Sequence, residues 1–168
     1  MTNKIRLVAL LAATALIAAC DDADHPEGSA PSEAGTPQPL QIFDITVQNL
    51  TYGQPFSPVG AVLHDGQFTP WTLGMPASAG LEQLAEGGDN SVFLNEGDAA
   101  GADATTSGRG LILPGTTETF SIFVTAGSGS HISLATMPVN TNDAFIGVRS
   151  ANVGGLAVGA SWTTYAPI

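Results

Sequence analysis

The sequence QIFDITVQ, residues 41–48, alternates apolar and polar side chains. Phe43, Ile45 and Val47 occupy every second position, and polar residues stand between them. Successive side chains of a β-strand point to opposite faces, so a period of two residues is typical of a strand with one buried face. This stretch therefore predicts the first strand of a folded domain that begins near residue 41.

Short strand patterns recur along the rest of the chain. They cover residues 59–63, 120–125, 132–137, 144–148 and 156–164, with Gly, Pro and Asn between them. At residues 120–125 both faces carry apolar side chains, so we expect this strand to be buried on both sides. Several short strands separated by turn residues favour an antiparallel β-sandwich of all-β class.

One helix interrupts the strand patterns. Residues 76–86, PASAGLEQLAE, begin with a proline, place Leu81, Leu84 and Ala85 on one face, and end at Gly87-Gly88. A proline at the start and a glycine at the end are typical helix boundaries. Residues 96–110 contain no apolar side chain larger than alanine, and we expect them to form a flexible loop. The prediction is a β-sandwich of about eight strands with one short helix.

The N-terminal residues 1–19 have the pattern of a cleavable export signal. Lys4 and Arg6 precede an uncharged run, residues 7–19, which is too short to span a bilayer comfortably. Small residues stand directly before Cys20 and resemble a bacterial lipobox. This resemblance implies cleavage before Cys20 and a diacylglycerol on its sulfur. Because Cys20 is the only cysteine, no thiol remains for a disulfide or a cysteine-ligated metal.

Residues 21–40 are rich in Pro, Gly, Ser and acidic residues, and they read as a disordered tether between Cys20 and the domain at residues 41–168. Cleavage would leave two basic residues against 15 acidic ones, a formal net charge of −13. Such a charge repels nucleic acid, which we exclude as a partner, and it attracts cations. The expected location is the bacterial cell envelope, with the domain lipid-anchored to a membrane and exposed to the periplasm or the cell exterior.

Four segments in order resemble the spondin N-terminal domain family. They are FDITVQNLTYGQPFSP at residues 43–58, His64-Asp65-Gly66 followed by Trp71-x-x-Gly74, ASAGLEQLAEGGD at residues 77–89, and LATMPVNTNDAFIGV at residues 134–148. The resemblance spans residues 41–168. It implies an eight-stranded antiparallel β-sandwich that acts as a non-catalytic binding or adhesion module.

The same resemblance implies a calcium site in loops at one end of the sandwich. The matching turn carries over Asp143 as a ligand, with Asn142 and backbone carbonyls beside it. A second family ligand, a Glu, corresponds roughly to Ser121, which brings no charge. A third belongs to a motif that normally follows the last strand, and the given sequence stops at residues 164–168, about where that motif should begin. Calcium needs six to eight oxygen ligands, and its affinity rises with their charge. We therefore expect a weak or incomplete calcium site.

Other polar residues offer weaker patterns for chemistry. His64-Asp65 reads as a strand end and turn, because no nucleophile motif of the type G-x-S-x-G accompanies it. His131 reads as a polar residue at a strand edge, and the three histidines are too far apart in sequence for a typical zinc site. Glu82 and Glu86 lie one helical turn apart, as two carboxylates on a solvated helix face. Trp71 and Trp162 are expected to pack in the core or at its rim.

The leading functional hypothesis is a lipid-anchored, spondin-like binding or adhesion module that is not an enzyme. Its partner would be an envelope or extracellular protein or a glycan. Two alternatives stay open: an envelope hydrolase or carbohydrate-active enzyme, and a periplasmic cation-binding protein. Mutual geometry discriminates them. The cation-binding hypothesis would be favoured if the carboxylates of Asp143, Glu86 and Asp89 surrounded one cavity. The enzyme hypothesis would be favoured if His64 contacted a Ser and an Asp.

Overall fold

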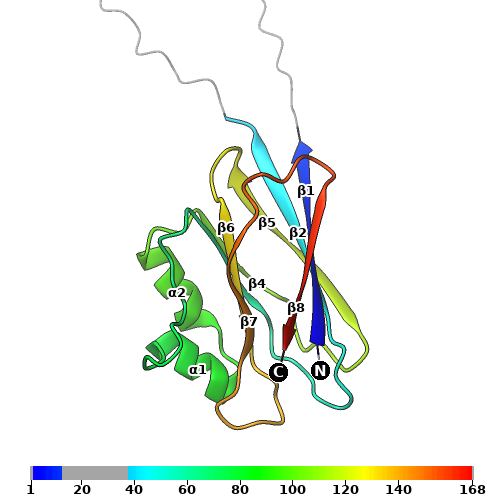
Figure 1. Cartoon of the computed structure of the whole chain (residues 1–168), viewed down its shortest axis with the longest axis vertical. Coiled ribbons are helices and arrows are strands. Elements are labelled where there is room, and N and C mark those ends of the chain that lie inside the picture. The colour runs from blue at the N-terminus through cyan, green and yellow to red at the C-terminus, as the bar shows by residue number, and fades with distance from the viewer. Residues whose placement is uncertain (1, 13–37, 168) are drawn as a thin grey trace, which may run out of the picture.

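The computed structural model of the whole chain describes residues 2–12 and 38–167. Most of the predicted tether, and Cys20 itself, lie outside these residues. The described residues form two four-stranded antiparallel sheets that pack face to face, with two helices on the outside of one sheet (Figure 1). The predicted all-β class is confirmed.

The first sheet has the strand order β5-β2-β1-β8. Its strands are β1 (Thr2–Ala12), β2 (Leu40–Gln48), β5 (Thr117–Thr125) and β8 (Ser161–Pro167). The second sheet has the order β4-β3-β6-β7. Its strands are β3 (Gly60–His64), β4 (Ala104–Ser107), β6 (His131–Thr136) and β7 (Ile146–Asn152).

The main core lies between the two sheets. Phe43, Ile45 and Val47 of β2 are at most 3% exposed, as their two-residue period predicts. They pack in one cluster with Phe120 and Ile122 of β5 and with the inner faces of β3 and β6. Burial of apolar side chains is the main stabilising term of such a sandwich, at roughly 25 cal/mol per Å² of apolar surface.

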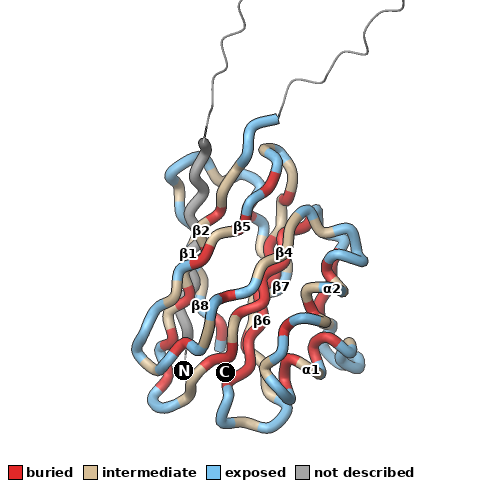
Figure 2. The backbone as a smooth tube through the Cα atoms, turned by 180° about the vertical axis from the view of Figure 1, so that it is seen from behind, coloured by how far each residue is buried: buried red, intermediate tan, exposed pale blue. Residues whose placement is uncertain are grey.

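The helices bury the outer face of the second sheet in a second, smaller core (Figure 2). Val62 of β3 and Ala135 of β6 point outward from the sandwich and pack against Leu81, Leu84 and Phe93 of the helices. Strands β3 and β6 are therefore buried on both faces, which agrees with the apolar run Ala61–Leu63 of β3 and with the burial of all but the first residue of β6.

The predicted burial of residues 120–125 on both faces is wrong. Phe123 is 59% exposed, whereas Phe120, Ile122 and Val124 are buried. The helices cover only the second sheet, so the outer face of β5 meets solvent (Figure 2). The sequence pattern alone does not say which of the two sheets carries the helices.

The predicted helix at residues 76–86 is present as α1 (Ala79–Gly87). Ser78 caps its first turn, because Ser78 Oγ accepts a hydrogen bond of 3.2 Å from the Leu81 backbone N–H. Gly88 ends the helix in the left-handed conformation, with φ of 71°, and donates its N–H to Leu84 O. Glycine is favoured at this position because it lacks a Cβ.

A second helix, α2 (Ser91–Ala99), corrects the prediction of a single helix. The stretch 96–110, predicted to be a flexible loop, contains the end of α2 and all of β4. Its small residues have a packing reason. A Cβ placed on Gly97 would lie 2.7 Å from Val62 Cγ1, so α2 comes close to β3 only because residue 97 has no side chain.

The segment predicted to be an export signal forms β1 at an inner position of the first sheet. It pairs antiparallel with β2 from Lys4–Gln48 to Ala12–Leu40 and with β8 from Thr2–Pro167 to Val8–Ser161. Cleavage before Cys20 stays a prediction, since residues 13–20 lie outside those described. Neither helix in the described part of the chain is long and apolar enough to cross a membrane.

Candidate functional site

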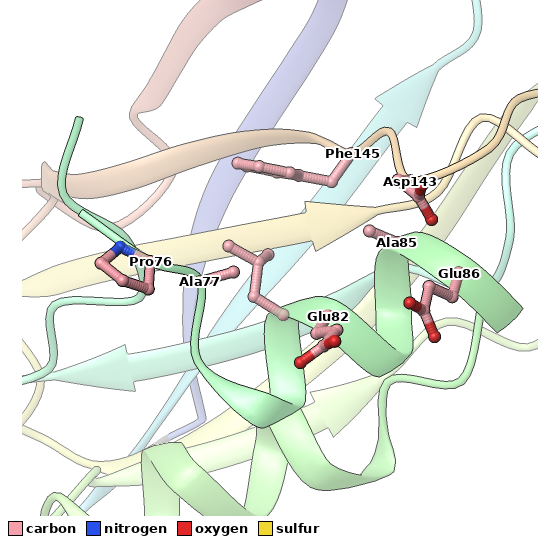
Figure 3. Close-up of a pocket in the computed structure, with 8 residues that line it drawn as sticks. Pro76, Ala77, Glu82, Ala85, Glu86, Asp143 and Phe145 are labelled. Atoms are coloured by element: carbon pink, nitrogen blue, oxygen red, sulfur yellow. The ribbon is translucent and has the colours of Figure 1, made fainter. Parts of the chain in front are cut away.

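A pocket of about 460 Å³ lies between α1 and the loop that joins β6 to β7 (Figure 3). Its volume falls in the range of small-molecule and side-chain binding pockets. Its apolar lining consists of Pro76, Ala77, Leu81, Ala85 and Phe145. Its acidic lining consists of Glu82, Glu86 and Asp143, and the structure gives it no basic side chain.

The helix supplies two of the three carboxylates. Glu82 and Glu86 are four residues apart, so both side chains project from the same face of α1 (Figure 3). Glu96 of α2 fixes the start of α1, because its carboxylate accepts hydrogen bonds from Ser78 Oγ at 2.7 Å and from the Gly80 backbone N–H at 2.8 Å. The position of the acidic helix face therefore depends on the second, unpredicted helix.

The third carboxylate comes from the β6–β7 loop. Asp143 has a left-handed backbone, with φ of 57°, which Asp tolerates better than most residues. Its side chain lines the pocket together with Glu82 and Glu86 of α1 (Figure 3). Earlier in the loop, the Asn140 backbone N–H donates to Gln54 Oε1 at 2.7 Å, which ties the loop to the segment after β2.

An aromatic pair supports the apolar wall of the pocket. Phe145 packs edge-to-face on Trp71, with ring centroids 4.9 Å apart. Arg149 Nη1 donates to Trp71 O at 3.0 Å and holds the segment that carries the indole. Trp71 thus packs at the rim of the second core, as predicted, and is not an open stacking platform. Trp162 lies half-buried in β8.

The structure brings together only part of the predicted metal site. Asp143 lines the pocket, whereas its exposed neighbour Asn142 does not. Ser121 lies in β5 of the other sheet and donates to Asp44 Oδ1 at 2.7 Å. Asp89 Oδ1 accepts a hydrogen bond of 2.9 Å from the Ser91 N–H at the start of α2, and Asp89 does not line the pocket. Among residues 2–12 and 38–167, no group of three His, Cys, Asp or Glu residues is arranged to hold a metal ion.

His64 is the residue that most resembles a catalytic group in sequence, and it is a buried structural residue. Its Nδ1 accepts from the Gly66 N–H at 3.0 Å, and its Nε2 lies 3.0 Å from Ser133 Oγ. Burial, and then the nearby His131, lowers the pKa of His64 below its ordinary value of 6.5. Both ring nitrogens are engaged, and His64 ends β3 as predicted. His131 begins β6 at the strand edge, half-buried, also as predicted.

Sequence reasoning missed the role of Asn49, which directly follows the last residue of β2. Asn49 is fully buried, and its Nδ2 donates to Gln54 O at 2.8 Å and Ile112 O at 2.9 Å. Its Oδ1 accepts from the Thr51 N–H and Oγ1. Asn49 therefore joins the loops that follow β2 and β4. The N-L-T triplet in the sequence is the only signal for this arrangement.

The joined loops expose five large apolar or aromatic side chains, which we call the end patch. It comprises Leu50, Tyr52, Leu111, Leu113 and Val139, between 37% and 92% exposed. Bridges of Phe56 with Ile112 and with Pro138 place the three loops side by side. Because β2 runs from Leu40 toward these loops, the loops that carry the end patch lie at the end of the sandwich far from residue 38, where α1 and the β6–β7 loop also lie (Figure 1).

Comparison with known protein families gives one match. The family model described as Spondin_N matches residues 48–165, which include all three acidic residues of the pocket. No curated protein matches the chain.

Proposed function

Because the chain belongs to the Spondin_N family, which supports a non-catalytic module of the extracellular adhesion type, we propose that it binds a protein partner at the bacterial envelope. In this proposal a diacylglycerol on Cys20 anchors the domain to a membrane, and residues 21–40 form the tether. The domain presents its pocket and end patch away from that membrane. The partner is an envelope or extracellular protein.

The acidic, apolar pocket is the observation that carries this proposal. Three carboxylates and five apolar side chains line it, so it suits a group with an aliphatic stem and a positive end. Lysine and arginine side chains have this character, because their methylene stems pack on apolar surface while the charge stays at the tip. Charge-assisted hydrogen bonds to the carboxylates would fix the tip, and Phe145 offers an aromatic wall.

The end patch extends the surface available to a protein partner. Tyrosine and apolar side chains without charged residues are typical of the centre of a protein interface. The patch lies at the same end of the sandwich as the pocket, so one partner can cover both. Exposed apolar surface of this kind is a mark of an interaction site.

A titration with small peptides tests the pocket. The probes are acetyl-Ala-Lys-Ala-amide and the matched peptide with norleucine, which keeps the stem and lacks the charge. We expect the lysine peptide to shift the amide resonances of Glu82, Glu86 and Asp143 in the purified full chain with Cys20→Ser, and the norleucine peptide to shift them much less.

Variants of single carboxylates complete this experiment. Glu86→Gln should lower the affinity for the lysine peptide several-fold. Asp98 is an exposed acid of α2 outside the pocket, so Asp98→Asn should leave this affinity unchanged. Equal chemical-shift changes with both peptides, or an equal loss of peptide affinity in both variants, would refute the proposal that the pocket binds basic side chains.

A weak calcium site is the second candidate function. Glu86 and Asp143 both line the pocket, and two carboxylates on one pocket attract a divalent cation (Figure 3). Two or three carboxylates on separate exposed elements supply fewer ligands than the six to eight that calcium takes, so we propose at most millimolar affinity.

A further inference from the structure

Three apolar side chains lie together on the outer face of the first sheet, at the end where β2 begins. Leu40 is 55% exposed, Phe123 is 59% exposed and Ile42 is half-buried. Phe123 is in register with Ile42 in the β2–β5 ladder, and Leu40 is two residues from Ile42, so the three side chains project from the same face. The helices cover the other sheet, and this face meets solvent (Figure 2). Both strands lie outside the segment that cleavage before Cys20 would remove.

A loop at the same end of the sandwich adds a fourth apolar side chain. Residues 153–160 join β7 to β8 at this end (Figure 1). The loop is tied to the β5–β6 turn, because the Val153 and Gly154 N–H groups donate to Ser130 O at 2.8 Å and 3.0 Å. Val158 of this loop is 58% exposed. We call these four side chains the anchor patch: Leu40, Ile42, Phe123 and Val158.

The strands and loops that carry the anchor patch are almost free of charge, although the chain is strongly acidic. Asp, Glu, Lys and Arg are absent from residues 38–43, 119–142 and 150–168. Asp44 of β2 is the nearest acid in sequence, and its Oδ1 accepts a hydrogen bond of 2.7 Å from Ser121 Oγ. Asp65 and Asp103 follow β3 and precede β4, in the second sheet. A surface of this kind enters a bilayer interface without the cost of dehydrating an unpaired charge.

The position of the anchor patch favours a membrane as its partner, and this step rests on the proposed lipid anchor. Leu40 opens β2 directly after the residues that would link the domain to a lipid on Cys20. About 20 flexible residues have a root-mean-square span of roughly 25 Å, so the anchor would hold the patch near the bilayer at a high effective concentration. A second copy of the chain is a poorer partner, because two domains with a net charge of −13 repel each other.

We infer that the lipid-anchored domain rests on the bilayer through the anchor patch, with Leu40, Phe123 and Val158 in the headgroup region of net-neutral lipids. Burial in this region stabilises the apolar side chains, and the acidic charge of the domain disfavours anionic lipids. Helix α1 and the β6–β7 loop lie at the opposite end of the sandwich, so the pocket would face away from the membrane (Figure 1). Four side chains bind too weakly to replace the lipid, so the contact sets the orientation of the domain and not its attachment.

Fluorescence quenching by lipids tests this inference in the full lipidated protein. Because the Cys20 sulfur would carry the lipid, a cysteine introduced elsewhere is the only thiol for a bimane label. The two label sites are Thr125→Cys and Thr117→Cys, exposed residues of the same type at opposite ends of β5. Both project from the outer face, about 27 Å apart along the strand, and Thr125 is in register with Leu40. The vesicles contain phosphatidylcholine and a doxyl-labelled phosphatidylcholine as the quencher.

We expect the label at residue 125 to be quenched at least about threefold more strongly than the label at residue 117, because the strand separates them by more than the depth of the interface. Phe123→Ser should lower the quenching at residue 125. Leu73→Ser removes an exposed leucine outside the anchor patch and should leave this quenching unchanged. Anionic phosphatidylglycerol in place of part of the phosphatidylcholine should lower the quenching.

Equal quenching of the two labels would overturn the inference, and so would unchanged quenching in Phe123→Ser or stronger quenching with phosphatidylglycerol. Aqueous iodide distinguishes a membrane from a protein as the partner. A label at residue 125 that is protected from iodide and not quenched by the lipid would show that a protein or a second copy covers the patch, which would also overturn the inference.

Failure of this inference and failure of the proposed function are distinguishable. Intact mass of the protein from membranes reports whether Cys20 carries a lipid. A chain without the lipid would refute the anchor and, with it, the inference. A lipidated chain with equal quenching of the two labels would refute the anchor patch alone, and the lysine-peptide titration of the pocket would be unaffected.

Discussion

His64 Nε2 lies 3.0 Å from Ser133 Oγ, and this contact joins the neighbouring strands β3 and β6 through their side chains. The Ser150 backbone N–H donates to the same oxygen at 3.0 Å. Because His64 Nδ1 accepts a backbone hydrogen bond, the ring is neutral with its proton on Nε2. A buried network of this kind stabilises the fold only while the imidazole stays uncharged.

We therefore predict that the domain loses stability as the pH falls below about 6.5. The pKa of His64 is lowered in the folded state, so the unfolded chain takes up a proton at a higher pH than the folded protein. The stabilisation is complete above the unfolded pKa of 6.5 and declines as the pH falls from there toward the folded pKa. Urea unfolding between pH 8 and pH 5 measures this slope.

The control for the pH effect is a pair of histidine variants. His64→Gln should remove most of the slope and destabilise the domain at pH 8 by about 1–3 kcal/mol, the cost of disrupting a buried hydrogen-bond network. His131→Gln, at the half-buried strand edge, should keep the lowered pKa of His64 and most of the slope. An unchanged slope in His64→Gln would contradict the prediction.

We expect the substitution of glycine by alanine to have opposite effects on stability at Gly97 of α2 and Gly87 of α1. Gly97→Ala should destabilise the domain by about 1–3 kcal/mol, because the new methyl group would lie 2.7 Å and 2.9 Å from the Val62 methyl carbons. Gly87→Ala meets nothing within 4 Å and should stabilise the domain by up to about 1 kcal/mol through helix propensity. Thermal melts of the two variants provide the test, and equal effects would show that α2 does not pack closely on β3.

Calcium should stabilise this chain very little. Free metal at one dissociation constant adds only about 0.4 kcal/mol, and a weak site does not exceed this near 1 mM calcium. Melting temperatures in EDTA and in about 1 mM calcium should differ by less than about 3 °C. A larger shift that disappears in Asp143→Asn would reveal a stronger site at the pocket than its exposed carboxylates suggest.

The anchor leads to a prediction that separates location from folding. Cys20→Ser should abolish metabolic labelling with a radioactive fatty acid and move the protein from the membrane to the soluble fraction. Circular dichroism should still show a folded β-sandwich, since Cys20 lies outside residues 2–12 and 38–167, which form the two sheets. Persistence of the variant in the membrane fraction after a high-salt wash would contradict a lipid anchor.

Strands with a clear two-residue alternation of apolar and polar side chains were predictable, because this alternation follows directly from burial of one face of the strand. Residues 41–48 form β2, and β3, β6, β7 and β8 overlap the predicted strands. Phe123 was placed wrongly because its exposure depends on which sheet the helices cover, a property of the whole fold. The second helix was missed because its C-terminal half consists of small and polar residues, a composition that is also typical of flexible loops. In the structure one of these residues, Gly97, is small because it packs closely on Val62.

The candidate site was predictable only in part. Asp143 and the Glu82–Glu86 pair were recognised separately, but the pocket that brings them together depends on the position of α1 against the β6–β7 loop. That position is set by Glu96, a residue that lay in a predicted loop. Ser121, which corresponds to a family ligand in sequence, donates a hydrogen bond to Asp44 in the first sheet and does not line the pocket with Asp143.

The direction of β2 determines how this domain would bear mechanical load. If residues 21–40 tether the domain as proposed, they would pull on the strand at Leu40, and a partner bound to the pocket would pull at the opposite end of the sandwich. Over nine residues the strand extends about 30 Å along the line between these two points. Force would act lengthwise on β2, so its backbone hydrogen bonds to β5 would be loaded together in shear and not opened one at a time. A domain arranged in this way resists being pulled from its anchor more strongly than its thermal stability alone would suggest.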